Sequence, residues 1–273
     1  MKNFHLHLVS DATGETVTSV VRACLVQFEN VPATLHQWWL VRTEGQVDRA
    51  LQGIALNPGI VLYTLVDPTV SERLVTGCRG LKIPCIGILD PVLAAFEDHF
   101  HREVDKPFPG RQHALDAEYF ERIDAMHYTM AHDDGQMLSG LDKADVILLG
   151  VSRTSKTPTC MYLANRGIKA ANVPLVPGVS LPEEVIAAKN AMIVGLTKDP
   201  SSLSDIRKNR LRLLDQSEDS DYADPEKVRE EVLSARRLFA THGWPVIDVT
   251  RRSIEEASAS IMQLLDKRRG EGS

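Results

Sequence analysis

Short apolar runs alternate with helical patterns along the first hundred residues, and this alternation constrains the fold more than any other feature of the sequence. Between the first two runs, Val17, Val21, Cys24 and Phe28 recur at spacings of four, three and four, which predicts one face of a helix. A strand followed by a helix, repeated, indicates a parallel sheet covered by helices. The predicted strands lie at residues 4–9, 35–41, 60–66 and 84–89.

The alternation is interrupted at residues 103–111, where two prolines and a glycine fall within positions 106–110. This composition is typical of a linker. We therefore predict an N-terminal parallel-sheet α/β domain over residues 1–105 and a second α/β domain over residues 106–273.

The second half repeats the alternation, with helices predicted at 114–130 and 253–265 and strands at 144–149, 191–196 and 245–249. Ser180 opens a capping-box pattern that predicts a helix start. Asp224 before a proline predicts another helix, closed by Gly243. The apolar face of that helix would carry Val228, Val232, Ala235 and Phe239.

Composition excludes several classes of protein. The 31 basic and 37 acidic residues give a net charge of −6, which argues against a nucleic-acid binder or a binder of anionic membranes. The first apolar run reaches Asp11 too soon for a signal peptide, and no run approaches about 18 apolar residues. No C-x-x-C pair occurs among Cys24, Cys78, Cys85 and Cys160. We expect a cytoplasmic protein with reduced thiols.

The sequence Gly150-Val151-Ser152-Arg153-Thr154-Ser155-Lys156-Thr157 matches the phosphate loop G-x-x-x-x-G-K-[ST] except that Ser155 replaces the second glycine. An apolar strand leads into Gly150 and a helix can begin at Ser155, so backbone N–H groups would meet phosphate oxygens. Lys156 would neutralise the terminal phosphate, and the Thr157 hydroxyl would hold Mg²⁺. The second domain is therefore predicted to be P-loop-kinase-like. The alternative is a capped strand-to-helix turn with a solvated lysine.

Phosphoryl transfer to a hydroxyl benefits from a carboxylate that accepts the hydroxyl proton. Asp133 and Asp134, shortly before the strand of the phosphate loop, are the candidates. The alternative is the end of a helix closed by Gly135. Asp248 is a candidate for a second Mg²⁺ ligand.

Two further features could bind phosphate. Arg207 and Arg210 are three residues apart on a predicted helix and could contact a transferring phosphate, although a solvated basic face is the alternative. Residues 10–16 follow the first strand, where open α/β sheets bind ligands, but an ordinary capped turn explains them as well. His5 with His7, and His99 with His101, have no third metal ligand at useful spacing.

Several motifs of the chain occur together in one order, at residues 10–16, 132–135, 150–158, 172–177, 195–197, 206–211, 222–224 and 246–256. With these motifs the chain resembles the pyruvate, phosphate dikinase regulatory protein family from residue 4 to about residue 265. The resemblance implies an ADP-dependent serine/threonine kinase that inactivates the dikinase by phosphorylating a threonine. It also implies a phosphate-dependent reactivation that releases pyrophosphate.

Within this resemblance, Gly150 to Thr157 would be the ADP site, and Ser155 is the family's own form of the loop. A sister branch acts on phosphoenolpyruvate synthase, and residues 4–16 look more like the dikinase branch. Two other readings stay open: a non-catalytic module that senses ADP or AMP, and a small-molecule kinase. The first domain has no G-x-G-x-x-G fingerprint, which favours a protein target or a homodimer contact.

Overall fold

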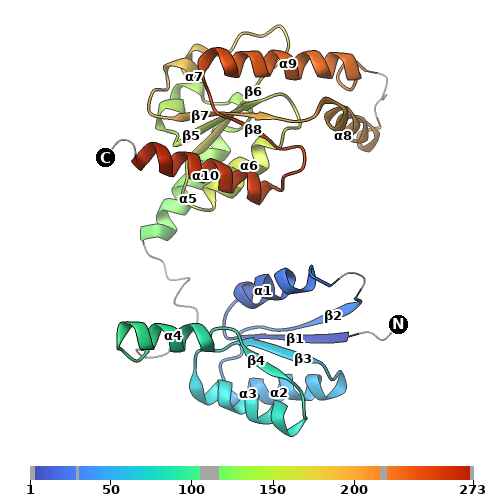
Figure 1. Cartoon of the computed structure of the whole chain (residues 1–273), viewed down its shortest axis with the longest axis vertical. Coiled ribbons are helices and arrows are strands. Elements are labelled where there is room, and N and C mark those ends of the chain that lie inside the picture. The colour runs from blue at the N-terminus through green and yellow to red at the C-terminus, as the bar shows by residue number, and fades with distance from the viewer. Residues whose placement is uncertain (1–3, 29–30, 105–116, 216–219, 271–273) are drawn as a thin grey trace. The chain divides into compact units, whose positions relative to one another are not determined.

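The computed structural model describes residues 4–28, 31–104, 117–215 and 220–270. It divides into two compact units, Met1–Ala114 and Leu115–Ser273 (Figure 1). Each unit contains a four-stranded parallel sheet, which confirms the predicted α/β class. The boundary predicted between residues 105 and 106, and all but residues 103 and 104 of the predicted linker, lie outside the described residues. The boundary therefore stays a prediction. None of the described helices is long and apolar enough to span a membrane.

In the first unit the strand order is β2-β1-β3-β4. Helix α1 covers one face of the sheet, and α2 and α3 cover the other (Figure 1). Side chains alternate along β1, so Leu8 packs toward α1 while Val9 joins the core under α2 and α3. The elements are β1 (Phe4–Ser10), α1 (Glu15–Leu25), β2 (Ala33–Trp38), α2 (Glu44–Leu56), β3 (Ile60–Thr64), α3 (Pro68–Gly80), β4 (Cys85–Gly87) and α4 (Asp90–Phe100).

The face predicted for the first helix is only half correct. Val17 and Val21 are buried, but α1 ends at Leu25 and both Cys24 and Phe28 are exposed. The apolar spacing therefore continued past the end of the helix. Phe28 lies in the turn that follows, where helical periodicity no longer decides which side chains meet the core.

In the second unit the strand order is β6-β5-β7-β8, with β5 inside the sheet. Helix α9 lies on one face, and α6 and α10 lie on the other (Figure 1). The elements are α5 (Ala117–Ala131), β5 (Val146–Gly150), α6 (Lys156–Ala164), β6 (Ala170–Pro174), α7 (Glu183–Ala187), β7 (Met192–Thr197), α8 (Pro200–Leu213), α9 (Pro225–His242), β8 (Val246–Asp248) and α10 (Ile254–Gly270).

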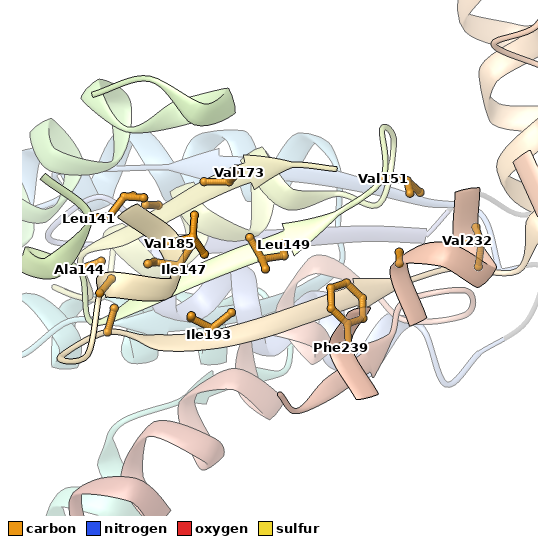
Figure 2. Packing of buried hydrophobic residues seen from close by; sticks show 14 of the residues in the cluster. Leu141, Ala144, Ile147, Leu149, Val151, Val173, Val185, Ile193, Val232 and Phe239 are labelled. Atoms are coloured by element: carbon orange, nitrogen blue, oxygen red, sulfur yellow. The ribbon is translucent and has the colours of Figure 1, made fainter. Parts of the chain in front are cut away.

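Both faces of β5 are buried, as the uninterrupted apolar run predicts. Ile147 and Leu149 face the core beneath α9, where Figure 2 shows Phe239 beside the sheet. Leu148 packs on the opposite side with residues of α6 and α10. Each fully buried leucine or isoleucine stabilises the fold by about 1.5–3 kcal/mol. This packing fixes β5, and so fixes the point at which the chain leaves the sheet at Gly150.

Of the helix signals predicted from the sequence, those of α9 are confirmed and that of α7 is wrong. The Asp224 carboxylate accepts from the Lys227 amide at 2.9 Å and caps α9, and Gly243 closes this helix with a left-handed φ of 65°, as predicted. The capping box at Ser180 is wrong, because α7 starts after Pro182 and has no side-chain cap. Ser180 stands two residues too early for that role.

Candidate phosphate-binding site

The predicted phosphate loop connects the buried end of β5 to the first residue of α6, Lys156. Two residues in this connection are left-handed, Arg153 with φ 72° and Ser155 with φ 61°. A non-glycine residue in this region costs roughly 1–2 kcal/mol, which explains why other phosphate loops place glycine where Ser155 stands. At Gly150 a side chain would not fit, because a Cβ there would lie 2.7 Å from the Leu196 carbonyl oxygen.

Lys156 is buried, with 6% of its surface exposed. Its Nζ donates to the Val151 carbonyl at 3.1 Å, so the side chain folds back over the loop. Burial lowers the pKa of Lys156 to about 8, while the nearby Asp134 and Asp133 act in the opposite direction. A buried ammonium that lacks a close carboxylate partner gains most from an arriving anion, which would replace the lost hydration.

A cavity of about 580 Å³ lies against the loop. The charged residues of its lining are Arg153, Lys156, Lys198 and Asp134, which give a formal charge of +2. A positive cavity at the start of a helix suits phosphate groups. Lys198, which follows β7, was not predicted from the sequence, and its only signal is its place at the carboxyl end of a strand.

The two predicted carboxylates lie beside the loop although they precede it by some twenty residues. Asp133 Oδ1 accepts from Thr157 Oγ1 at 2.9 Å and also from Asn172 Nδ2. Asn172 is 1% exposed. Its side-chain Oδ1 accepts from the backbone N–H of Asp134 at 3.2 Å, and its backbone N–H donates to the His132 carbonyl at 3.2 Å. Asn172 therefore fastens the acidic turn to β6. The sequence placed Asn172 in a motif of the family, at residues 172–177, but did not predict this role.

Asp134 differs from its neighbour in position. Its side chain is exposed and lines the cavity, and its backbone is left-handed with φ 49°. Gly135 follows with φ 77° in a short 3₁₀ turn after α5. The backbone here is the helix end closed by Gly135 that the alternative predicted. The side chains nevertheless reach the site, because Asp134 lines the cavity and Asp133 accepts from Thr157.

The two arginines predicted as phosphate contacts lie in different surroundings. Arg207 is 1% exposed and binds the Glu231 carboxylate with N···O distances of 2.7 and 3.2 Å. It also donates to the Tyr222 carbonyl at 2.8 Å and to the Ser152 carbonyl at 3.3 Å. Arg210 is exposed, and the described lining of the cavity includes neither arginine. The two arginines do share the predicted helix, but the guanidinium of Arg207 binds the largely buried Glu231, whose side chain is 13% exposed.

The other sequence candidates lie elsewhere. In the first unit, Asp11 Oδ2 accepts from the Val66 amide at 2.9 Å and Ser10 Oγ accepts from Thr64 Oγ1 at 3.0 Å, so both side chains join the ends of β1 and β3. Asp248 accepts from the Thr250 amide at 2.8 Å and is absent from the described cavity lining. The carboxylate beside Thr157 is that of Asp133.

A parallel sheet in which an inner strand ends at the predicted phosphate loop, with a buried lysine and adjacent carboxylates, is the arrangement expected of a phosphotransferase-like α/β protein. The family model described as Kinase/pyrophosphorylase matches residues 6–262. The chain belongs to this kinase/pyrophosphorylase family, which confirms the predicted family.

Curated relatives extend over nearly the whole chain. One from Paramagnetospirillum magneticum is 65% identical, over 98% of this chain and 86% of its own length. One from Rhodospirillum rubrum is 55% identical, over 97% of this chain and 96% of its own length. One from Caulobacter vibrioides is 51% identical, over 98% of this chain and 84% of its own length. Each is described as a putative pyruvate, phosphate dikinase regulatory protein.

Proposed function

We propose that this protein transfers the β-phosphoryl group of ADP to a threonine of pyruvate, phosphate dikinase and also reverses the modification. In the first reaction the threonine oxygen forms the new bond to phosphorus, the bond to the α-phosphate oxygen breaks, and AMP leaves. In the second, an oxygen of inorganic phosphate bonds to the phosphorus of the phosphothreonine, the bond from that phosphorus to the threonine oxygen breaks, and pyrophosphate and the free threonine hydroxyl are released. Both reactions need one site that holds two linked phosphoryl groups. The family and the names of the relatives support this choice.

The observation that carries the proposal is the buried Lys156 at the floor of a cavity with a charge of +2. ADP and pyrophosphate are both diphosphates, so a site of this kind serves both reactions. Backbone N–H groups at the start of α6 and the Lys156 ammonium would bind their oxygens. Charge that develops on these oxygens during transfer is stabilised by groups already in place.

Thr157 and Asp133 would hold Mg²⁺. A hydroxyl and a carboxylate oxygen, 2.9 Å apart at the loop, are the hard oxygen ligands that this ion prefers. When bound, Mg²⁺ would neutralise charge on the phosphate oxygens. Because Asp133 Oδ1 is already engaged by two donors, Asp134 is the better base: it would accept the threonine proton during phosphorylation and return it during removal.

The test of the function incubates the protein with Mg²⁺ and ADP, together with either pyruvate, phosphate dikinase or phosphoenolpyruvate synthase. Mass spectrometry should find a new phosphothreonine in the dikinase, and added phosphate should remove it with release of pyrophosphate. Modification of the synthase alone would refute the choice of target. Nucleotide binding with no modification of either protein would favour the sensing module, and phosphate on a soluble metabolite would favour a small-molecule kinase.

Lys156→Met tests the shared site, with the exposed Lys143→Met as the matched control. Removing one electrostatic donor from such a site costs about 10²–10³-fold in rate. Both reactions should lose this much in Lys156→Met and nothing in the control. If only one reaction falls, the two do not share a site.

Asp134→Asn should lower both rates by about 10²–10⁴-fold and remove the acidic limb of the pH–rate profile. Asp133→Asn should instead raise the Mg²⁺ concentration needed for half-maximal rate. A pH profile that is unchanged in Asp134→Asn would show that another group moves the proton.

All four cysteines are free thiols, which fits a reaction in the cytoplasm.

A further inference from the structure

We call the cavity of about 580 Å³ beside the loop the phosphate cavity. A second cavity, of about 690 Å³, adjoins it. The loop after β6, residues 175–181, forms one wall, and one side of α9 forms the other. Val151 of the phosphate loop lines this second cavity, and Val176 lines both cavities. A ligand that extends past Val176 would therefore reach from one cavity into the other. We call the second cavity the α9 pocket.

The phosphate loop is joined to the wall of the α9 pocket by Tyr222. The Tyr222 hydroxyl is hydrogen-bonded to Ser152 Oγ at 3.0 Å and accepts from Arg153 Nε at 3.3 Å. The Arg207 guanidinium lies 4.6 Å from the centre of the Tyr222 ring and also binds Glu231. These contacts join Tyr222, which lines the α9 pocket, to two residues that line the phosphate cavity, Ser152 and Arg153.

The two cavities have opposite charge. The lining of the α9 pocket contains Asp221, Glu230 and Glu231 against Lys227, a formal charge of −2, whereas the phosphate cavity carries +2. Even with Glu231 neutralised by Arg207, the balance of the α9 pocket remains negative. The anionic part of a nucleotide is thus directed to the phosphate cavity and away from the α9 pocket.

The position of the proposed base indicates which reactant lies on this side. Asp134, Pro174 and Val176 all line the phosphate cavity. If the accepting hydroxyl lies next to the proposed base Asp134, the polypeptide that carries it can extend along Pro174 and Val176. That path leads directly to the α9 pocket.

The rim of the pocket is apolar and open to solvent. Val176 is 50% exposed and Val179 is 67% exposed, while Leu175, Leu181 and Leu238 lie deeper in the lining. An apolar hollow with a negative edge fits an apolar side chain on a segment that carries positive charge. The nucleoside part of ADP is uncharged and gains nothing from the negative edge, whereas a basic segment does.

We propose that the α9 pocket receives an apolar side chain of the target polypeptide close to its threonine, with a basic residue of that segment near Glu230. This inference rests on the proposed function. The pocket thereby selects the protein substrate, while the phosphate loop selects the nucleotide.

Ser234→Phe tests the inference, because Ser234 lines the pocket from an exposed position of α9 and a phenyl ring there fills the hollow. Losing one buried apolar side chain should weaken dikinase binding by about 10- to 100-fold. The Kd for dikinase, measured by calorimetry without nucleotide, and the KM for dikinase should both rise by this factor. The Kd for ADP should stay unchanged. Leu233→Phe, at the exposed neighbouring position outside the lining, is the matched control.

Glu230→Lys should also weaken dikinase binding, and the loss should shrink at high salt because it is electrostatic. Glu226→Lys, on the same helix but outside the lining, controls for the change in net charge. Dikinase binding equal in the wild type and Ser234→Phe would overturn the inference, as would a loss confined to ADP binding. A wild-type protein that binds dikinase but transfers no phosphate would instead overturn the proposed function.

Discussion

Replacing Arg207 by methionine should destabilise the second unit by about 3–5 kcal/mol, because removing one partner of a buried ion pair leaves an uncompensated charge. Arg207 is 1% exposed and its partner Glu231 has 13% of its side chain exposed. Methionine keeps most of the aliphatic packing, so the loss reports mainly on the charge and on the hydrogen bonds to Tyr222 and Ser152. A domain is typically stable by only about 5–15 kcal/mol, so the change is easily measured.

The decisive comparison is with Arg207→Met combined with Glu231→Met. Replacing both partners of a buried pair by apolar residues of similar size is often close to neutral, so the double variant should recover most of the lost stability. Urea unfolding measured by fluorescence gives these values for the second unit alone, if Trp38 and Trp39 are first changed to phenylalanine. The remaining Trp244 packs against the core beneath α9.

Two results would refute this reasoning. A loss below about 1 kcal/mol in Arg207→Met, far under the expectation for a buried pair, would mean that the ion pair does not stabilise the unit. A stable double variant that still lost phosphoryl transfer by more than about 10²-fold, the size of one electrostatic donor, would show that Arg207 acts in the reaction and not only in stability.

Two further changes test the loop and the first unit. Gly150→Ala should weaken ADP binding at least about tenfold and cost about 1–3 kcal/mol of stability, since its Cβ would lie 2.7 Å from Thr154 Oγ1; ADP calorimetry and urea unfolding give both values. Burial lowers the pKa of His7, whose Nδ1 accepts from Trp38 at 3.2 Å, so the unfolded chain takes up a proton first as the pH falls. Stability of the first unit should be complete above about pH 6.5, the ordinary pKa of histidine, and decline below it. Tryptophan fluorescence should show a smaller decline in His7→Gln; an equal decline would show that His7 is not the group responsible.

Much of the fold could be predicted because its strands are apolar runs with short connections. The central strand β5 is fully buried and was found from its composition alone. Strand β6 was not predicted from its pattern, because Val173 is the only β-branched residue among its five. It becomes a strand through pairing with β5, in which Leu148 lies opposite Asn172, and that pairing is a property of the assembled sheet.

The site was predictable to the extent that it is contiguous. The loop from Gly150 to Thr157 can be read from eight neighbouring residues, and the acidic turn at Asp133 from a short motif. The sequence could not predict that the loop and the turn lie side by side, because their contact depends on Asn172, which reaches the turn only once β6 pairs with β5. Arg207 shows the reverse case: its spacing suggested a phosphate contact, but the carboxylate that binds it lies 24 residues away on α9.

Side chains from outside the loop hold both of its ends, and the proposed chemistry requires a loop of fixed shape. At one end Arg207 and Tyr222 bind Ser152, and at the other Asp133 binds Thr157. The loop needs such support because its left-handed residues raise its free energy when no ligand is bound. A site that accepts ADP in one reaction and phosphate in the other has to keep its shape between them. Bracing from α8 and from the acidic turn maintains that shape, so the cost of ordering the loop falls on folding rather than on each binding event.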